Sequence, residues 1–134
     1  MNQYEIWIAD LNPQIGTEAG KSRPVLIVQT NLLNKIQHPS TIVCPITTNV
    51  LDDSDILRVH LKKGMANLHE NCDIMIDQIR AIDNKRLIKK VGNLPTDLID
   101  KILNHLEKLK INRPEVAHLI DGGIELIFEK ATNI

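Results

Sequence analysis

The sequence predicts an α+β fold, with a small curled or barrel-like antiparallel sheet and a helix against one side of it. Short apolar segments of strand length recur between residues 4 and 82, and polar turn-forming residues separate them. Residues 96–110 instead repeat apolar side chains at helical spacing. Strands followed by a helix favour the α+β class, and a length of 134 residues suits a single domain with a real core.

Several segments in the first half of the chain have the apolar pattern and the length of strands. These strands are expected at residues 4–9, 24–29, 41–46 and 57–61. Pro24 excludes helical backbone at Arg23, because a residue that precedes a proline is restricted to extended conformations. Pro45 has no backbone N–H to donate, so it predicts an edge strand or a bulge.

The second half is expected to form a short turn and then the helix. An amphipathic turn is predicted over residues 83–90, with Leu87 and Ile88 pointing inward. Thr96 is a good N-cap residue for the helix, which is expected to run to about Lys110. The apolar stripe of this helix predicts that it packs on the sheet.

The last residues are expected to add to the same domain. We divide the chain into a barrel domain, residues 1–112, and a C-terminal extension, residues 113–134, packed on that domain. Within the extension, Ile124, Leu126 and Phe128 alternate with polar residues, which suggests a late strand.

Composition excludes several classes of protein. The net charge of −1 gives no global positive field to recruit nucleic acid, so any such binding needs a local patch. The only aromatic residues are Tyr4, Trp7 and Phe128, too few for binding that depends mainly on base stacking. Cys44 and Cys72 lack metal-ligand spacing and are expected to be buried, reduced thiols. No signal peptide or membrane-length apolar run is present, so we expect a cytoplasmic protein.

Arg23 and Thr47 are the first candidates for chemistry. Arg23 precedes one apolar strand and Thr47 follows the next, so neighbouring strands would bring them to one end of the sheet. A guanidinium makes planar, permanently charged contacts to phosphate oxygens, and a hydroxyl adds a neutral donor. The pair suits a phosphodiester, although an arginine at a strand start is more often part of a structural ion pair.

Separate blocks of residues appear in an order that resembles the MazF/PemK family of bacterial toxin endoribonucleases. The blocks are residues 10–13 (Asp-Leu-Asn-Pro), 16–20 (Gly-Thr-Glu-Ala-Gly), 23–29 (Arg-Pro-Val-Leu-Ile-Val-Gln), 41–47 (Thr-Ile-Val-Cys-Pro-Ile-Thr) and 77–87 (Asp-Gln-Ile-Arg-Ala-Ile-Asp-Asn-Lys-Arg-Leu). The resemblance runs from about Tyr4 to Lys110 and does not include the extension.

The resemblance implies a small SH3-like barrel and a homodimer. It implies metal-independent cleavage of single-stranded RNA, with no cofactor, in which the 2′-OH attacks and leaves 2′,3′-cyclic phosphate and 5′-OH ends. The family's functional arginine and threonine fall on Arg23 and Thr47. A cognate antitoxin, whose disordered tail occupies the RNA groove, is the expected partner.

Two positions depart from the PemK branch of the family. Met75 stands where that branch has an arginine, and Thr17 stands where it has a histidine, so we follow the scheme built on Arg23 and Thr47. A guanidinium has a pKa above about 12 and is a poor general base. Glu18 lies in the loop before Arg23, and we name it as the alternative base or, equally, a solvated carboxylate.

The remaining candidates concern binding. Thr17, Lys21, Asp77 and Gln78 are the expected substrate-binding residues, although Asp77 and Gln78 can equally serve a sheet edge and an ion pair. A basic middle of the chain suggests a phosphate track or a solvated face, formed by Arg58, Lys62, Lys63, Lys85, Arg86, Lys89 and Lys90. The histidines lack metal spacing and are read as surface or packing residues.

Two other functions remain open from the sequence. A toxin of the same fold can grip a protein target such as a gyrase without cleaving RNA, and a barrel can bind RNA or peptide without catalysis. The presence of both Arg23 and Thr47 favours the enzyme over these alternatives.

Overall fold

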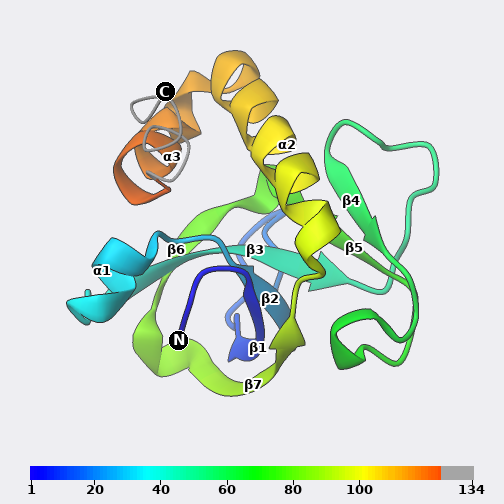
Figure 1. Ribbon diagram of the computed structural model, residues 1–134, viewed down its shortest axis with the longest axis horizontal. Helices are drawn as coiled ribbons and strands as arrows, with labels where there is room; N and C mark the ends of the chain where they lie inside the picture. The colour runs from blue at the N-terminus through cyan, green and yellow to red at the C-terminus, as the bar shows by residue number, and fades with distance from the viewer. Residues whose placement is uncertain (125–134) are drawn as a thin grey trace.

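The computed structural model describes residues 1–124 of the chain, which form one antiparallel sheet flanked by helices (Figure 1). The strands are β1 (Glu5–Asp10), β2 (Ser22–Ile27), β3 (Ser40–Thr47), β4 (Arg58–Leu61), β5 (Cys72–Met75), β6 (Arg80–Asp83) and β7 (Leu87–Asn93). Their order in the sheet is β4-β5-β3-β2-β1-β7, and β6 pairs with β3 off this path. Every one of these pairings is antiparallel.

Helices and short 3-10 turns connect the strands and follow the sheet. The α-helices are α1 (Asn31–Lys35), α2 (Ile99–Asn112) and α3 (Ala117–Gly123). The 3-10 turns are η1 (Met65–Asn67), η2 (Ile76–Gln78), η3 (Asn84–Arg86), η4 (Thr96–Leu98) and η5 (Pro114–Val116). In Figure 1, α2 crosses over the sheet and α3 lies beyond its C-terminal end. The predicted α+β class and SH3-like sheet are confirmed, with the difference that β4 and β7 end the hydrogen-bonded order, so the barrel is open.

Pro45 lies inside the central strand β3, so the predicted edge strand or bulge is wrong. On one side, β2 places Val25 opposite Pro45. On the other side, β6 pairs with residues 40–43, whereas β5 pairs with Ile46 and Thr47. Pro45 therefore falls between two partner strands, where a residue without an N–H is tolerated.

The amphipathic turn predicted over residues 83–90 is confirmed only over η3, residues 84–86, and is wrong beyond it, because β7 begins at Leu87. β7 pairs with β1 along its length, including Trp7 opposite Lys90. Ile88 is exposed rather than inward-facing. This polar strand forms because β1 supplies backbone partners, which outweighs the weak pattern of its own side chains.

The predicted helix is confirmed as α2, with a different start. Thr96 opens the turn η4 and Pro95 occupies the N-cap position without a side-chain cap, so the predicted Thr96 cap is wrong. α2 ends at Asn112 because Arg113 precedes a proline, which disfavours helical backbone. Its apolar stripe is buried as predicted, at Ile102, Leu103, Leu106 and Leu109.

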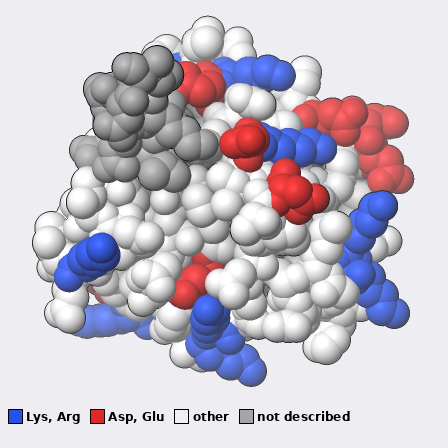
Figure 2. All heavy atoms as spheres, viewed as in Figure 1, with Lys and Arg blue, Asp and Glu red and all other residues white. Residues whose placement is uncertain are grey.

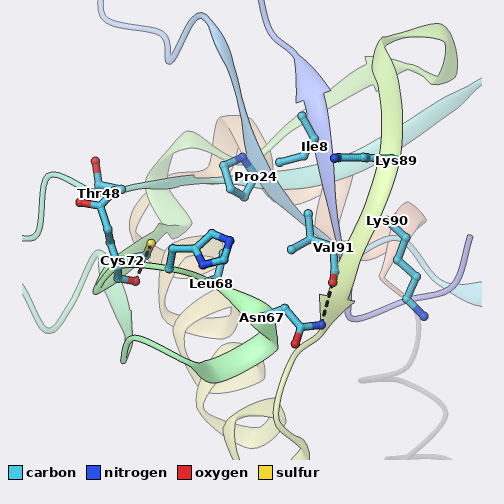
Figure 3. Close-up of a pocket in the computed structure, with 11 residues that line it drawn as sticks. Ile8, Pro24, Thr48, Asn67, Leu68, Cys72, Lys89, Lys90 and Val91 are labelled. Carbon is cyan, nitrogen blue, oxygen red and sulfur yellow. Dashed lines mark hydrogen bonds between the residues drawn. The ribbon is translucent and has the colours of Figure 1, made fainter.

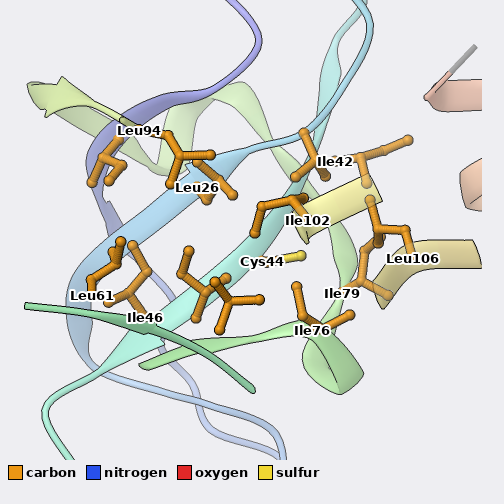
Figure 4. Packing of buried hydrophobic residues seen from close by; sticks show 14 of the residues in the cluster. Leu26, Ile42, Cys44, Ile46, Leu61, Ile76, Ile79, Leu94, Ile102 and Leu106 are labelled. Carbon is orange, nitrogen blue, oxygen red and sulfur yellow. The ribbon is translucent and has the colours of Figure 1, made fainter. Parts of the chain in front are cut away.

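Two apolar clusters occupy opposite faces of the sheet. The larger lies under α2, where Leu26 and Cys44 from the sheet pack in one cluster with Ile102 and Leu106 (Figure 4). The smaller cluster contains Ala9, Leu11, Val25, Ile27, Val43 and Ile82, and Trp7, Ala19 and Leu87 pack against it. Because side chains alternate along each strand, Arg23 and Thr47 belong to the face of the smaller cluster.

Part of the predicted extension contacts the sheet domain. Ile120 and Ile124 are fully buried in the larger cluster, and the Gly123 carbonyl accepts a hydrogen bond from the Thr30 amide at 2.7 Å. The division at residue 112 stays a prediction. The predicted late strand depends on Leu126 and Phe128, which lie outside the described residues. None of the helices within residues 1–124 has the length and apolar composition that a membrane span requires.

Gly92 in β7 lies too close to η1 for any side chain. A Cβ at Gly92 would lie 2.6 Å from the Ala66 carbonyl oxygen, and this backbone oxygen has no side-chain freedom to move away. We expect Gly92→Ala to lower the free energy of unfolding by about 1 to 3 kcal/mol. A Cβ at Gly122 meets nothing within 4 Å, so Gly122→Ala is the matched control. Urea unfolding measures both, and equal stabilities for the two variants would contradict the predicted clash.

Candidate active site

The register of β2 and β3 brings the two predicted catalytic residues opposite each other. Val25 pairs with Pro45, and continuing this register by two residues on each strand sets Arg23 across from Thr47. Opposed residues of an antiparallel pair share a face, with their Cβ atoms about 4.5 to 5.5 Å apart. Both side chains are half-buried, so both reach solvent at this end of the sheet.

Local contacts hold both side chains without using all of their donors. Arg23 Nε donates to the Gly20 carbonyl at 2.8 Å, the only hydrogen bond of this guanidinium within residues 1–124. Thr47 Oγ1 accepts from the Asn49 amide at 3.1 Å, so its hydroxyl proton remains available. The terminal guanidinium nitrogens and the hydroxyl can therefore donate to a phosphate group.

The residues opposite Thr47 on the next two strands, β5 and β4, belong to a charged network that the sequence did not predict. Thr47 pairs with Asp73, and Asp73 pairs with His60. The fully buried Asp73 carboxylate accepts hydrogen bonds from Arg58 at 3.2 Å, the Leu51 amide at 2.9 Å and His60. The sequence signal for this network was the alternation of Arg58 and His60 in the predicted strand 57–61. An acidic residue on a neighbouring strand, opposite His60, would pair with these cations.

His60 is therefore not simply a surface residue. Its hydrogen bond to Asp73 raises its pKa above the ordinary value of 6.5, burial opposes this, and the charges of Asp73 and Asp55 add to it. Arg58 is the cation that faces the same Asp73 carboxylate. The folded protein thus favours the imidazolium form of His60 more than the unfolded chain does.

This raised pKa predicts a pH-dependent contribution of His60 to stability. A group with a raised folded-state pKa stabilises most below its unfolded value, so the contribution is full below pH 6.5 and is lost as pH rises through the folded pKa. We expect His60→Gln to cost about 1 kcal/mol at low pH and less as pH rises. Unfolding curves across pH measure the difference, and the exposed His118→Gln is the control. A cost that stays constant with pH would contradict the prediction.

All of the remaining predicted site residues except Lys21 gather in a separate hollow, which we call the arginine pocket. It has a volume of about 300 Å³, and its lining includes Thr17, Glu18, Asp77, Gln78, Arg80 and Arg113. Gln78 joins the two walls, because its side chain accepts from the Ala19 amide and donates to the Thr17 carbonyl, both at 3.3 Å. The structure thus brings Glu18 together with Asp77 and Gln78. The lining of the arginine pocket does not include Arg23 or Thr47.

Lys21 lies at the base of the loop between β1 and β2, outside the arginine pocket. Its amide donates to Asn12 Oδ1 at 2.8 Å, and its carbonyl accepts from the Leu11 amide at 2.9 Å. Its backbone lies in the left-handed region, with φ of 65°. These bonds close the loop, and Lys21 is exposed.

A larger hollow of about 580 Å³ adjoins the end of β3 (Figure 3). Figure 3 shows Thr48 on one side of it and Lys89 and Lys90 on the other. A neighbouring hollow of about 500 Å³ shares Thr48 and reaches Lys63. Lysines therefore line both of these hollows, which together we call the lysine-bordered depression.

The predicted basic track is only partly supported by these positions. Arg58 pairs with Asp73, and Arg86 donates to the carbonyls of Asp10 and Asn12, so both arginines hold the fold. Figure 2 shows cations and anions interspersed over the face it presents. Of the predicted track, the residues that line hollows are Lys62, Lys63, Lys89 and Lys90.

The cysteines and metal-ligand residue types form no site within residues 1–124. Cys44 and Cys72 are buried free thiols, as predicted, and burial raises the pKa of the Cys44 thiol. No group of three or more His, Cys, Asp or Glu residues in this described part is arranged to hold a metal ion.

Comparisons with known proteins agree with the fold and with the sequence blocks. Endoribonuclease EndoA of Bacillus subtilis is 32% identical over 98 residues, which cover 73% of this chain and 84% of that protein. Endoribonuclease MazF of Staphylococcus saprophyticus is 31% identical over 107 residues, or 80% of this chain and 88% of the relative. These relatives place the chain among endoribonuclease enzymes.

A solved structure supports the fold at lower identity. An endoribonuclease in complex with its cognate antitoxin, from a mycobacterial species, superposes with a TM-score of 0.64 at 17% identity, over 81% of this chain and 92% of that one. A model of the family described as PemK-like, MazF-like toxin of type II toxin–antitoxin system matches residues 2–109. The chain belongs to this PemK-like, MazF-like family of type II toxins.

Proposed function

We propose that this protein is a toxin that cleaves single-stranded RNA without a metal ion or cofactor. The 2′ oxygen bonds to the adjacent phosphorus and the bond from phosphorus to the 5′ oxygen breaks. The products are a 2′,3′-cyclic phosphate and a 5′-OH end. The observation that carries the proposal is the β2–β3 register, because it supplies a guanidinium and a hydroxyl on one face at one end of the sheet.

Arg23 is proposed to stabilise the charge that grows on the phosphorane. A guanidinium can donate two parallel hydrogen bonds to phosphate oxygens and cannot be deprotonated in a protein. It is therefore suited to electrostatic stabilisation and unsuited to act as the base. The Thr47 hydroxyl donates to the same group of oxygens, from the neighbouring strand.

Glu18 is the proposed base that takes the 2′-OH proton. Glu18 lies in the loop whose Gly20 carbonyl accepts a hydrogen bond from Arg23. One loop would therefore supply the base and hold the arginine that stabilises the phosphorane. The proton must finally reach the 5′ oxygen that leaves. A carboxylate can accept the first proton, which a guanidinium cannot do near neutral pH.

The wider site and the partners follow from the same family scheme. We propose that Thr17, Lys21, Asp77 and Gln78 bind the RNA, and that the lysine-bordered depression follows its phosphates. We further propose a cytoplasmic homodimer and a cognate antitoxin that blocks the RNA site. The mycobacterial relative, solved with its antitoxin, supports the last point.

The test is cleavage of a single-stranded RNA in excess EDTA, with sequencing of the new 5′-OH ends. We expect the parent to cut and Thr47→Ala to cut about 10- to 100-fold more slowly, because one donor to a charged group is lost. Thr47→Ser should recover most of the rate, and the exposed Thr96→Ala should match the parent. Absence of new ends with the parent protein, together with capture of a topoisomerase, would favour the protein-binding alternative.

A further inference from the structure

Arg113 brings a second guanidinium to the arginine pocket from outside the family match. The family match ends at residue 109, whereas Arg113 follows α2 and lines the same hollow as Arg80, Asp77 and Gln78. A chain of the family that ended with α2 would lack this wall. The pocket is therefore completed by a residue that lies beyond the family match.

The backbone and side chain of Arg113 are both anchored. Its amide donates to the Leu109 carbonyl at 2.7 Å, and Pro114 restricts it to extended backbone. Arg113 Nη1 donates to the Asp77 carbonyl at 3.2 Å, and Nε donates to Glu115 Oε1 at 2.9 Å. Within residues 1–124, these bonds leave Nη2 without a partner, so a donor remains for a ligand.

The pocket also contains charged side chains that make no direct ion pair with the described residues. Within residues 1–124, the side chains of Glu18, Asp77 and Arg80 make no hydrogen bond or ion pair. Unpaired carboxylates and guanidiniums around one hollow suit a ligand that carries both hydrogen-bond donors, for the carboxylates, and negative charge, for the guanidiniums. A volume of about 300 Å³ is at the small end for ligand sites, which fits one nucleotide rather than a longer segment.

We propose that Arg113 and Arg80 make the arginine pocket a subsite for one unpaired guanine nucleotide of the RNA strand. Arginine guanidiniums bind phosphate or stack on a base, and a carboxylate accepts hydrogen bonds from the base's Watson–Crick edge. Of the RNA bases, guanine offers two adjacent N–H donors there, which match the Asp77 carboxylate. This subsite sets sequence preference, and it rests on the proposed function.

The test is to map cleavage of a randomised single-stranded RNA library by the parent protein and by Arg113 variants. Arg113 holds the nucleotide against the Asp77 carboxylate that binds the guanine edge, so we expect Arg113→Ala to reduce the preference for guanine at one position about 10-fold. The linkage cut and the 5′-OH ends should stay the same. Arg113→Lys keeps the charge but not the planar fork, so its preference should be intermediate. Lys108→Ala removes the same charge from exposed α2 and should keep the parent profile.

A binding measurement separates this inference from the proposed function. In the Arg23→Ala background, fluorescence anisotropy compares a guanine-containing oligonucleotide with its adenine-substituted counterpart, with and without Arg113→Ala. If the parent does not cleave RNA but guanine preference in binding depends on Arg113, the subsite stands and the proposed reaction fails. If Arg113→Ala leaves the guanine preference unchanged in both experiments, the subsite is overturned.

Discussion

Arg23→Ala is expected to lower the rate constant for RNA cleavage by about 100- to 1,000-fold, the usual cost of removing one preorganised donor from a charged transition state. Arg23 lies across from Thr47 when the β2–β3 register is continued, and the only hydrogen bond of its guanidinium within residues 1–124 is to the Gly20 carbonyl. Losing that bond should change the free energy of unfolding by no more than about 1 kcal/mol. Single-turnover cleavage in EDTA and a urea titration measure the two quantities.

Two further variants distinguish charge from geometry at this position. Arg23→Lys retains a cation but cannot donate two parallel hydrogen bonds, so its rate should fall between those of the parent and Arg23→Ala. Lys35→Ala removes an exposed positive charge from α1 and should cut at the parent rate. Parent-like cleavage by a folded Arg23→Ala protein would remove this side chain from the reaction.

The strands that carry Arg23 and Thr47 could be predicted because their signals are local. Pro24 forces extended backbone before an apolar run, and β3 has a continuous apolar pattern up to Thr47. The register that opposes the two residues is not local, since it depends on which residues pair across the sheet. The order of the strands along the chain predicted that Arg23 and Thr47 lie at the same end of the sheet. That they lie directly opposite each other could be known only from the structure.

Features set by distant contacts were missed for the same reason. β7 has a weak pattern of its own and is a strand because it pairs with β1. Asp73 gains its role from strands on both sides, and Arg113 meets Asp77 across 36 positions of sequence. In each case the side chain or strand is ordinary in isolation, and its neighbours in space determine what it does.

Asp73→Ala is expected to lower the free energy of unfolding by about 3 kcal/mol, the largest loss that we expect from any single polar side chain. The Asp73 side chain is 0% exposed and accepts from Arg58, His60 and the Leu51 amide. Removing it takes this acceptor from Arg58, His60 and the Leu51 amide, and breaking a buried ion pair costs about 3 to 5 kcal/mol. The exposed Asp53→Ala is the control, with a change within about 0.5 kcal/mol.

The pH dependence of the Asp73 effect identifies its cause. Asp73 raises the pKa of His60, so part of its contribution is present below pH 6.5 and is lost as pH rises through the folded pKa of His60. The hydrogen bond from Arg58 does not depend on the charge of His60, so the remaining part of the cost should persist at high pH. Asp73→Asn keeps the side chain's shape without its charge, and should remove the pH-dependent part while the fold is retained. Urea unfolding of the parent, both Asp73 variants and Asp53→Ala at several pH values measures both parts, and an Asp73→Ala cost near that of Asp53→Ala would contradict the assigned network.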